Sequence, residues 1–137
     1  MAAPFRTRRR IEFADTDMAG IVHFSNFFRF MEAAEVDFLV SRGLCVSMET
    51  PEGWIGFPRV SAACDYLRPA KFLDEIDVTV QVTKVGSKSV AYQFEFFKGD
   101  ELLARGQVTA VCCRHNGDRL ESVAIPPAIR QQLESPS

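Results

Sequence analysis

The residues best suited to chemistry lie in one short stretch, Asp15–Phe27. It carries two acids, Asp15 and Asp17, then Gly20, and it leads into an expected helix start at Ser25 or Asn26. The first turn of a helix presents unpaired backbone N–H groups and a positive dipole end, which suit a developing oxyanion. A carboxylate just upstream can act as a nucleophile or as a base for water. Spacing alone also allows both aspartates to be solvated or capping residues.

Three neighbours of this pattern have open roles. Gly20 lets the backbone approach a substrate closely. His23 adjoins the expected helix start, where it either donates to a carbonyl, acts as a base in a dehydratase, or serves only as a structural histidine. Glu32, on the helix, either orients water or the loop, or makes a buried hydrogen bond. Asp15 is expected to be structural, because only one carboxylate is needed.

The element that positions this stretch is a helix from about Ser25 or Asn26 to Arg42. Gly43 closes it, and glycine suits the left-handed position that follows a helix. Ser25 or Asn26 can cap its start. Apolar residues cover too wide an arc for a surface helix, so we expect other structure to enclose it. The apolar residues are Phe24, Phe27, Phe28, Phe30, Met31, Ala34, Phe38 and Leu39.

The rest of the chain is typical of strands joined by short turns. Alternating apolar residues predict half-buried strands, and short turns predict antiparallel pairing. A loop is expected around 44–53, and Pro126-Pro127 begins a short helix or a frayed tail. The expected strands cover residues 5–13, 54–67, 76–83, 90–96 and 102–114. The fold predicted for residues 1–137 is a single α+β domain of the hotdog type, a curved antiparallel β-sheet wrapped around a long central α-helix.

The acidic loop resembles a motif of the 4-hydroxybenzoyl-CoA thioesterase family. That motif is D-x-D-x-x-G-[IV]-V, followed by a helix bearing an acid. It is matched by Asp15, Asp17, Gly20, Ile21, Val22 and Glu32. Gly56-Phe57-Pro58 and Tyr66–Ala70 extend the resemblance, which runs from about Arg8 to Ile125.

The resemblance implies an acyl-CoA or aroyl-CoA thioesterase. Asp17 falls on the catalytic carboxylate, the backbone N–H of Phe24 on the group that polarises the thioester carbonyl, and Lys88 on a contact to coenzyme A phosphates. Many members carry tyrosine where this chain has Phe27, and arginine near the position of Glu35. These two departures predict an altered acyl pocket and leave Asp17 untouched.

Two other hypotheses stay open. A hotdog hydratase or dehydratase would use His23 and Glu32 as its acid/base pair, but it would leave the Asp15–Gly20 loop without a role. A non-catalytic acyl-CoA binding protein would need no catalytic carboxylate. Phe24, Phe27, Phe28 and Trp54 are candidates for an aromatic pocket and are equally good core residues.

Composition limits the partners and the compartment. A net charge of −2 gives no field that favours nucleic acid, and no apolar run approaches a membrane span. Neither a metal nor a resident cofactor is expected, since coenzyme A belongs to the substrate. The four cysteines are expected to be reduced packing residues, in agreement with a cytoplasmic location. Twelve phenylalanines and unclosed sheet edges predict a homo-oligomer, a dimer or a homotetramer.

Overall fold

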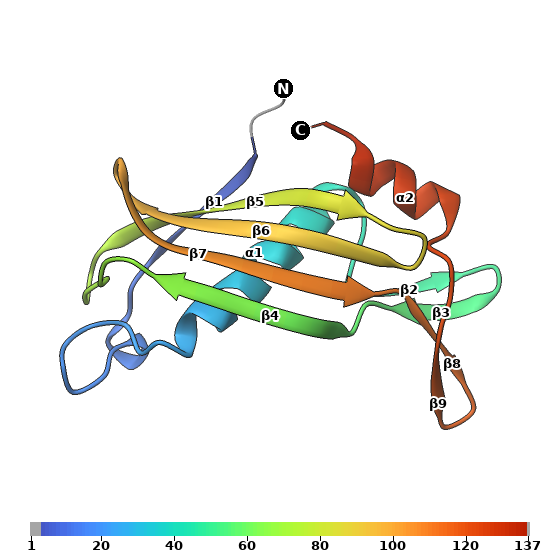
Figure 1. Ribbon diagram of the computed structural model, residues 1–137, viewed down its shortest axis with the longest axis horizontal. Helices are drawn as coiled ribbons and strands as arrows, with labels where there is room; N and C mark the ends of the chain where they lie inside the picture. Colours follow the sequence, from blue (N-terminus) through green and yellow to red (C-terminus); the bar gives the residue numbers. More distant parts are fainter. Residues whose placement is uncertain (1–3, 137) are drawn as a thin grey trace.

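The computed structural model describes residues 4–136 as two antiparallel sheets and two α-helices (Figure 1). The helices are α1 (Asn26–Ser41) and α2 (Pro127–Glu134), and the short 3-10 helix η1 spans Phe13–Asp15. The long strands are β1 (Phe5–Arg10), β4 (Arg59–Tyr66), β5 (Glu75–Val85), β6 (Ser89–Lys98) and β7 (Glu101–Val111). The short strands are β2 (Ser47–Thr50), β3 (Gly53–Gly56), β8 (Cys113–Asn116) and β9 (Arg119–Ser122).

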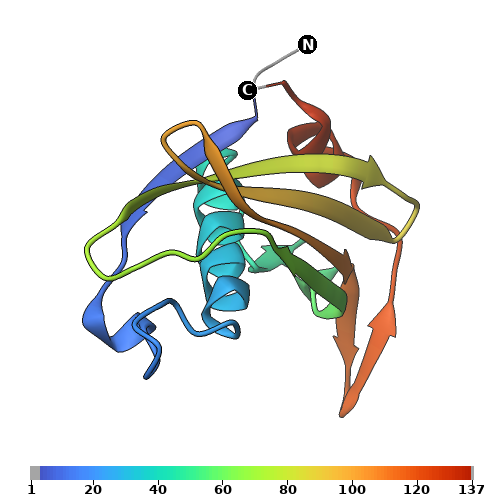
Figure 2. The ribbon, with the colours of Figure 1, turned by 60° about the vertical axis from the view of Figure 1, so that its left-hand side comes forward.

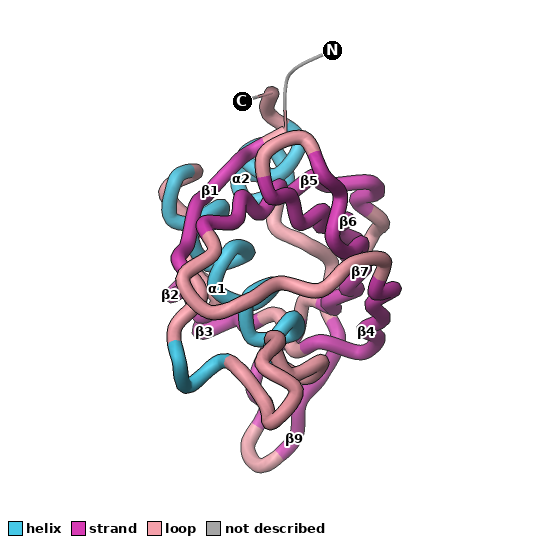
Figure 3. Tube along the Cα trace, turned by 90° about the vertical axis from the view of Figure 1, so that its left-hand side faces the viewer, coloured by secondary structure: helices cyan, strands magenta, loops and turns pink. Residues whose placement is uncertain are grey.

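The main sheet has the order β1-β5-β6-β7-β4 and curves around α1 (Figures 1 and 3). Its inner face is apolar because every second side chain of a strand points the same way. On β6 the buried positions are Val90, Tyr92, Phe94 and Phe96, as the alternation predicts. The predicted hotdog architecture is therefore confirmed.

Helix α1 lies against this inner face. Its buried residues include Phe27, Phe30, Met31 and Phe38, while Arg29, Glu32, Asp37 and Val40 on the other side are exposed. We expected other structure to enclose this helix, but within a single chain only one of its faces is covered. Gly106 of β7 sets the close approach, because a Cβ atom there would overlap the sulfur of Met31.

A second sheet of four short strands, in the order β2-β3-β8-β9, was not predicted. The expected loop at 44–53 contains β2. The expected strand at 54–67 is two strands, because Pro58 cannot donate a ladder hydrogen bond and separates β3 from β4. The expected strand at 102–114 divides at Cys112, whose N–H donates to the Lys88 carbonyl at 2.7 Å while its carbonyl accepts from the Val123 N–H at 2.9 Å.

The chain ends on α2, which confirms the helical alternative for the C-terminus. This helix lies over the far end of β5, away from the loop that precedes α1 (Figure 2). Among the described residues, no helix is both long and apolar enough to cross a membrane.

Candidate active site

The loop between β1 and α1 is held in a defined shape by its own backbone. The Asp17 N–H donates to Ile21 O at 2.9 Å, and the Gly20 N–H donates to Asp17 O at 3.0 Å. This turn requires a φ of +81° at Gly20, a value that side chains disfavour. A Cβ atom on Gly20 would meet nothing within 4 Å. Backbone conformation therefore explains this glycine, and its predicted close approach to a substrate stays a prediction.

Asp15 is built into the loop. Its carboxylate is buried and accepts a hydrogen bond from the Glu12 N–H at 2.8 Å. Its carbonyl accepts from the His23 N–H at 2.9 Å and from the Asn26 side-chain amide at 2.8 Å. Asp15 thereby ties η1 to the start of α1, and its carboxylate is not available to a substrate.

Asp17 has the opposite setting. Its Oδ1 accepts a hydrogen bond from the Ala19 N–H at 2.8 Å, which fixes the carboxylate over the turn. The side chain is partly exposed and lines a cleft of about 460 Å³. The rest of the lining is mostly apolar and comes from Ile21, Val22, Phe24, Phe27, Tyr66, Leu67, Arg68 and Pro69. A carboxylate at the edge of an apolar cleft can meet a reacting carbonyl carbon directly.

The backbone N–H of Phe24 belongs to a residue that lines the same cleft. Within residues 4–136 it donates no hydrogen bond, whereas the N–H groups of Val22, His23 and Ser25 each have an acceptor. The position just before α1 adds the positive end of the helix dipole. The loop therefore brings together a carboxylate, an unpaired N–H donor and an apolar cleft.

His23 turns toward the helix start instead of the cleft lining. Its Nδ1 lies 2.8 Å from Ser25 Oγ and accepts from the Ser25 N–H at 3.3 Å. Its ring stacks on Phe24 with 4.6 Å between centroids. The expected Ser25 or Asn26 side-chain cap is wrong: Ser25 makes no such bond, and Asn26 is used to hold Asp15.

The two glutamates of α1 differ sharply. Glu32 is exposed, which contradicts its predicted buried alternative. Glu35 is 1% exposed, and its Oε1 accepts from Nη2 of Arg59 at 2.9 Å. Burial raises the pKa of Glu35, while the Arg59 guanidinium opposes this effect. Glu35 therefore belongs to the core of the sheet–helix packing, at a distance from the cleft lining.

Several predicted contacts are not brought to this cleft. Phe24 and Phe27 line it, but Phe28 does not, and Trp54 lines a separate cavity on the second sheet. Lys88 is exposed in the turn between β5 and β6. That turn and the Asp17 loop lie at opposite ends of the sheet, about 35 Å apart along an 11-residue strand (Figure 1).

Tyr66 and Arg59 were missed as functional candidates. Tyr66 lines the cleft and donates its hydroxyl hydrogen to the Phe24 carbonyl at 2.8 Å. Its aromatic character within the Tyr66–Ala70 segment was the available signal. Arg59 carried no signal, because its partner Glu35 is brought near only by the fold.

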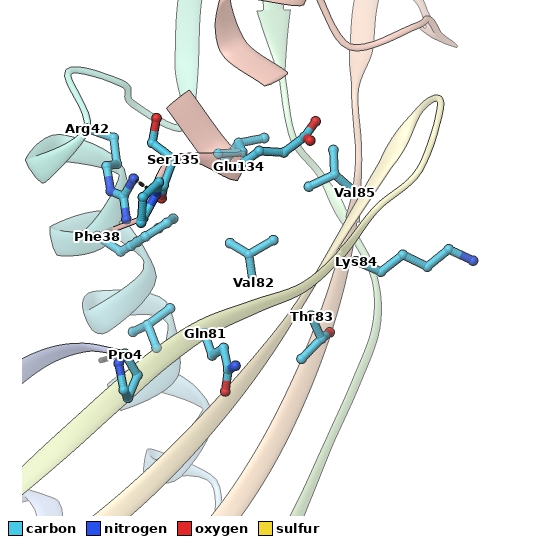
Figure 4. A pocket seen from close by; sticks show the side chains of 13 residues that line it. Pro4, Phe38, Arg42, Gln81, Val82, Thr83, Lys84, Val85, Glu134 and Ser135 are labelled. Carbon is cyan, nitrogen blue, oxygen red and sulfur yellow. Dashed lines mark hydrogen bonds between the residues drawn. The ribbon is translucent and has the colours of Figure 1, made fainter. Parts of the chain in front are cut away.

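Another cleft of about 440 Å³ lies at the far end of α1, between β5 and α2 (Figure 4). Its most prominent polar group, the Arg42 guanidinium, donates to the Ser135 carbonyl at 2.5 Å and lies over the Phe38 ring. Arg42 thus braces α2, and the carboxylate of Glu134 lines the same cleft.

Cysteine and metal chemistry have no support in the described residues. The four cysteines are unpaired, and no group of three or more His, Cys, Asp or Glu side chains among residues 4–136 has the arrangement of a metal site. Burial raises the pKa of the Cys64 thiol to about 11, so it stays protonated at neutral pH.

Comparison with known proteins agrees with this geometry. The sequence profile of the thioesterase-like superfamily matches residues 11–133, and the chain belongs to that superfamily. The predicted resemblance to hotdog thioesterases and the predicted enzyme class, a thioester hydrolase, are thereby confirmed.

Individual relatives cover nearly the whole chain. A protein of Aquifex aeolicus named "Putative esterase" is 32% identical over 96% of this chain and 98% of its own length. The 4-hydroxybenzoyl-CoA thioesterase of Pseudomonas sp. (strain CBS-3) is 29% identical over 92% of this chain and 94% of its own. The solved structure of a gentisyl-coenzyme A thioesterase is 28% identical, with a TM-score of 0.82, and the match covers 94% of this chain and 99% of that one.

Proposed function

We propose that this protein hydrolyses an aroyl-CoA thioester to the free acid and coenzyme A, with Asp17 as the catalytic carboxylate. The observation that carries the proposal is the shared cleft: Asp17 lines it, and the unpaired Phe24 N–H adjoins it at the start of α1. A thioester carbonyl bound there would have a carboxylate on its carbon and an N–H donor on its oxygen.

The chemistry can follow two routes from this arrangement. As a nucleophile, Asp17 attacks the carbonyl carbon, expels coenzyme A as its thiolate, and leaves an acyl–aspartyl anhydride that water then hydrolyses. As a base, Asp17 takes a proton from water, which attacks the carbon directly, and the tetrahedral intermediate then expels coenzyme A as its thiolate. In both routes the tetrahedral oxyanion is stabilised by the Phe24 N–H and the helix dipole.

An aromatic acyl group fits the cleft better than a long aliphatic one. The walls include the rings of Phe24, Phe27 and Tyr66, and aromatic rings pack favourably edge to face. Some relatives are named for aromatic acyl groups, among them the 4-hydroxybenzoyl-CoA thioesterase and a 1,4-dihydroxy-2-naphthoyl-CoA hydrolase of Picosynechococcus sp.. The observations therefore favour aroyl-CoA substrates over fatty acyl ones.

We propose a homo-oligomer built on β4, as a dimer or a homotetramer of such dimers. β4 is an outer strand of the main sheet and carries the small exposed residues Ser61, Ala62 and Ala63. The other outer strand, β1, carries exposed arginines that oppose pairing. Two copies related by a two-fold axis would pair their β4 strands antiparallel.

That pairing would also give Lys88 a role. An antiparallel β4 pair brings the far end of one copy toward the Asp17 end of the other, so Lys88 of a second copy would be the one near coenzyme A phosphates.

Light scattering should return a mass of at least twice 15.4 kDa, and a stable monomer at micromolar concentration would contradict the oligomer.

The cytoplasmic location and the two alternative functions remain predictions. For a hydratase, His23 and Glu32 would have to act together, yet His23 is bonded to Ser25 and Glu32 is exposed. An acyl-CoA binding protein would retain the ligand without turnover.

The decisive assay is a panel of aroyl-CoA and fatty acyl-CoA thioesters, with release of free thiol followed over time. The proposal predicts hydrolysis with the fastest rates on aroyl-CoA. Water addition to an enoyl-CoA would support the hydratase, and binding without thiol release would support the binding protein. Either result would contradict the proposed activity.

A further inference from the structure

Tyr66 joins the sheet to the loop at the one residue whose N–H is proposed to bind the oxyanion. Its hydroxyl donates to the Phe24 carbonyl at 2.8 Å, across 42 positions of sequence. We infer that Tyr66 is a positioning residue, which holds Phe24 so that its N–H points at the thioester oxygen. This inference rests on the proposed thioesterase function.

The Phe24 carbonyl needs such a partner. The turn hydrogen bond it accepts from the Phe27 N–H is long, at 3.4 Å, so the Tyr66 hydroxyl provides its shorter contact. The carbonyl and the N–H of one residue are joined through two rotatable bonds. Fixing the carbonyl therefore limits how far the N–H can swing.

Tyr66 itself is held firmly. It pairs with Ala104 on β7, and the next N–H, that of Leu67, donates to Leu103 O at 2.8 Å. Its ring packs edge-on against the buried Phe27, with 5.3 Å between centroids, and against Phe24 at 6.4 Å. A strand at the sheet edge thus supplies a rigid anchor for Phe24, just ahead of α1.

The hydroxyl can act as a donor over a wide pH range. Burial raises the pKa of Tyr66 above its ordinary value of 10, so the group keeps its proton at neutral pH. Tyr66 is therefore suited to orienting the loop and not to exchanging protons with the substrate.

Tyr66→Phe tests the inference because it removes the hydroxyl and keeps the ring. The chain offers a matched control in Tyr92→Phe, the same change on β6, buried on the inner face of the sheet and outside the cleft lining. We expect Tyr66→Phe to lower kcat about 10-fold, a fraction of the loss seen when an oxyanion donor is removed outright. KM should change less than twofold, and Tyr92→Phe should leave kcat within twofold.

The acyl panel separates positioning from direct substrate contact. A positioning role lowers kcat by a similar factor for every acyl group, whereas a substrate contact would raise KM and depend on the acyl group. The amide ¹H–¹⁵N shift of Phe24 should move in Tyr66→Phe and not in Tyr92→Phe, with both variants folded by circular dichroism.

The inference is overturned if Tyr66→Phe keeps wild-type kcat while Asp17→Asn is inactive, or if its loss appears in KM alone. An unmoved Phe24 amide signal would also overturn it. If no thioester is cleaved by the wild-type protein, the proposed function fails instead, and the amide signal still reports whether Tyr66 holds Phe24.

Discussion

The loop ahead of α1 and the middle of α1 each hold a carboxylate, and the surroundings of the two carboxylates are opposite. Asp17 in the loop is partly exposed and lines a cleft, with one oxygen fixed by the Ala19 N–H. Glu35 in the helix is buried, and its Oε1 is bound by Arg59 on β4. Only the first can reach a substrate.

The difference lies in what surrounds each acid. A buried charge is tolerated when a partner offsets its lost hydration, and Arg59 is that partner for Glu35. An acid beside an unpaired N–H group and an open cleft is free to act on a bound carbonyl. Asp17, just ahead of α1, is therefore expected to affect catalysis. Glu35, where the middle of α1 meets β4, is expected to affect stability.

The largest expected effect is the loss of turnover in Asp17→Asn. Removing a positioned base or nucleophile should lower kcat at least ~10²-fold with the fold retained. Asp15→Asn is the matched control within the same loop. Because Asp15 bonds the Glu12 N–H and does not line the cleft, its loss should appear mainly in the free energy of unfolding. Near-normal turnover in Asp17→Asn would refute the site.

Gly20→Val should come next, with kcat reduced about 10- to 100-fold by displacement of the loop. The cause is backbone strain, because valine strongly disfavours a φ of +81°. Gly117→Val is the control, since Gly117 has a φ of +65° in the β8–β9 turn and equally open surroundings. It should lose similar stability in urea denaturation and keep its kcat. Equal losses of kcat in both variants would show that turnover does not depend specifically on the shape of the Asp17 loop.

His23→Ala should have a smaller effect on turnover, a loss of ~10-fold or less, within the range of one neutral hydrogen bond. The reason is that His23 bonds Ser25 and does not line the cleft. Steady-state thioester hydrolysis measures this directly. Abolished activity in His23→Ala together with an active Asp17→Asn would favour the hydratase chemistry instead.

The smallest expected effect concerns Glu35→Gln and the pH dependence of stability. The pKa of Glu35 is raised above its ordinary value near 4.5, so the folded state holds this proton more tightly than the unfolded state. The contribution of Glu35 to the free energy of unfolding is full below pH 4.5 and is lost as pH rises through the raised folded-state pKa. The glutamine variant should lack this decline. Thermal unfolding from pH 4 to 7 would contradict the account if both proteins followed the same curve.

The helix, the long strands and the acidic loop were predictable because their signals are local. Gly43 ends α1 with a φ of +74°, and the alternation in β6 specifies its buried face. The second sheet was missed because strands of four residues are too short to show a period. The contacts of Arg59 with Glu35 and of Tyr66 with Phe24 span 24 and 42 positions, so only the folded chain brings them together.

The most direct test measures kcat and the free energy of unfolding for Asp17→Asn and Glu35→Gln side by side on the preferred thioester. Each change replaces a carboxylate with an amide of nearly the same shape. The predicted result is a loss of kcat of at least ~10²-fold with unchanged stability for Asp17→Asn, and near-normal kcat with altered pH-dependent stability for Glu35→Gln. The reverse pattern, with turnover lost only in Glu35→Gln, would contradict the assignment of catalysis to the loop ahead of α1.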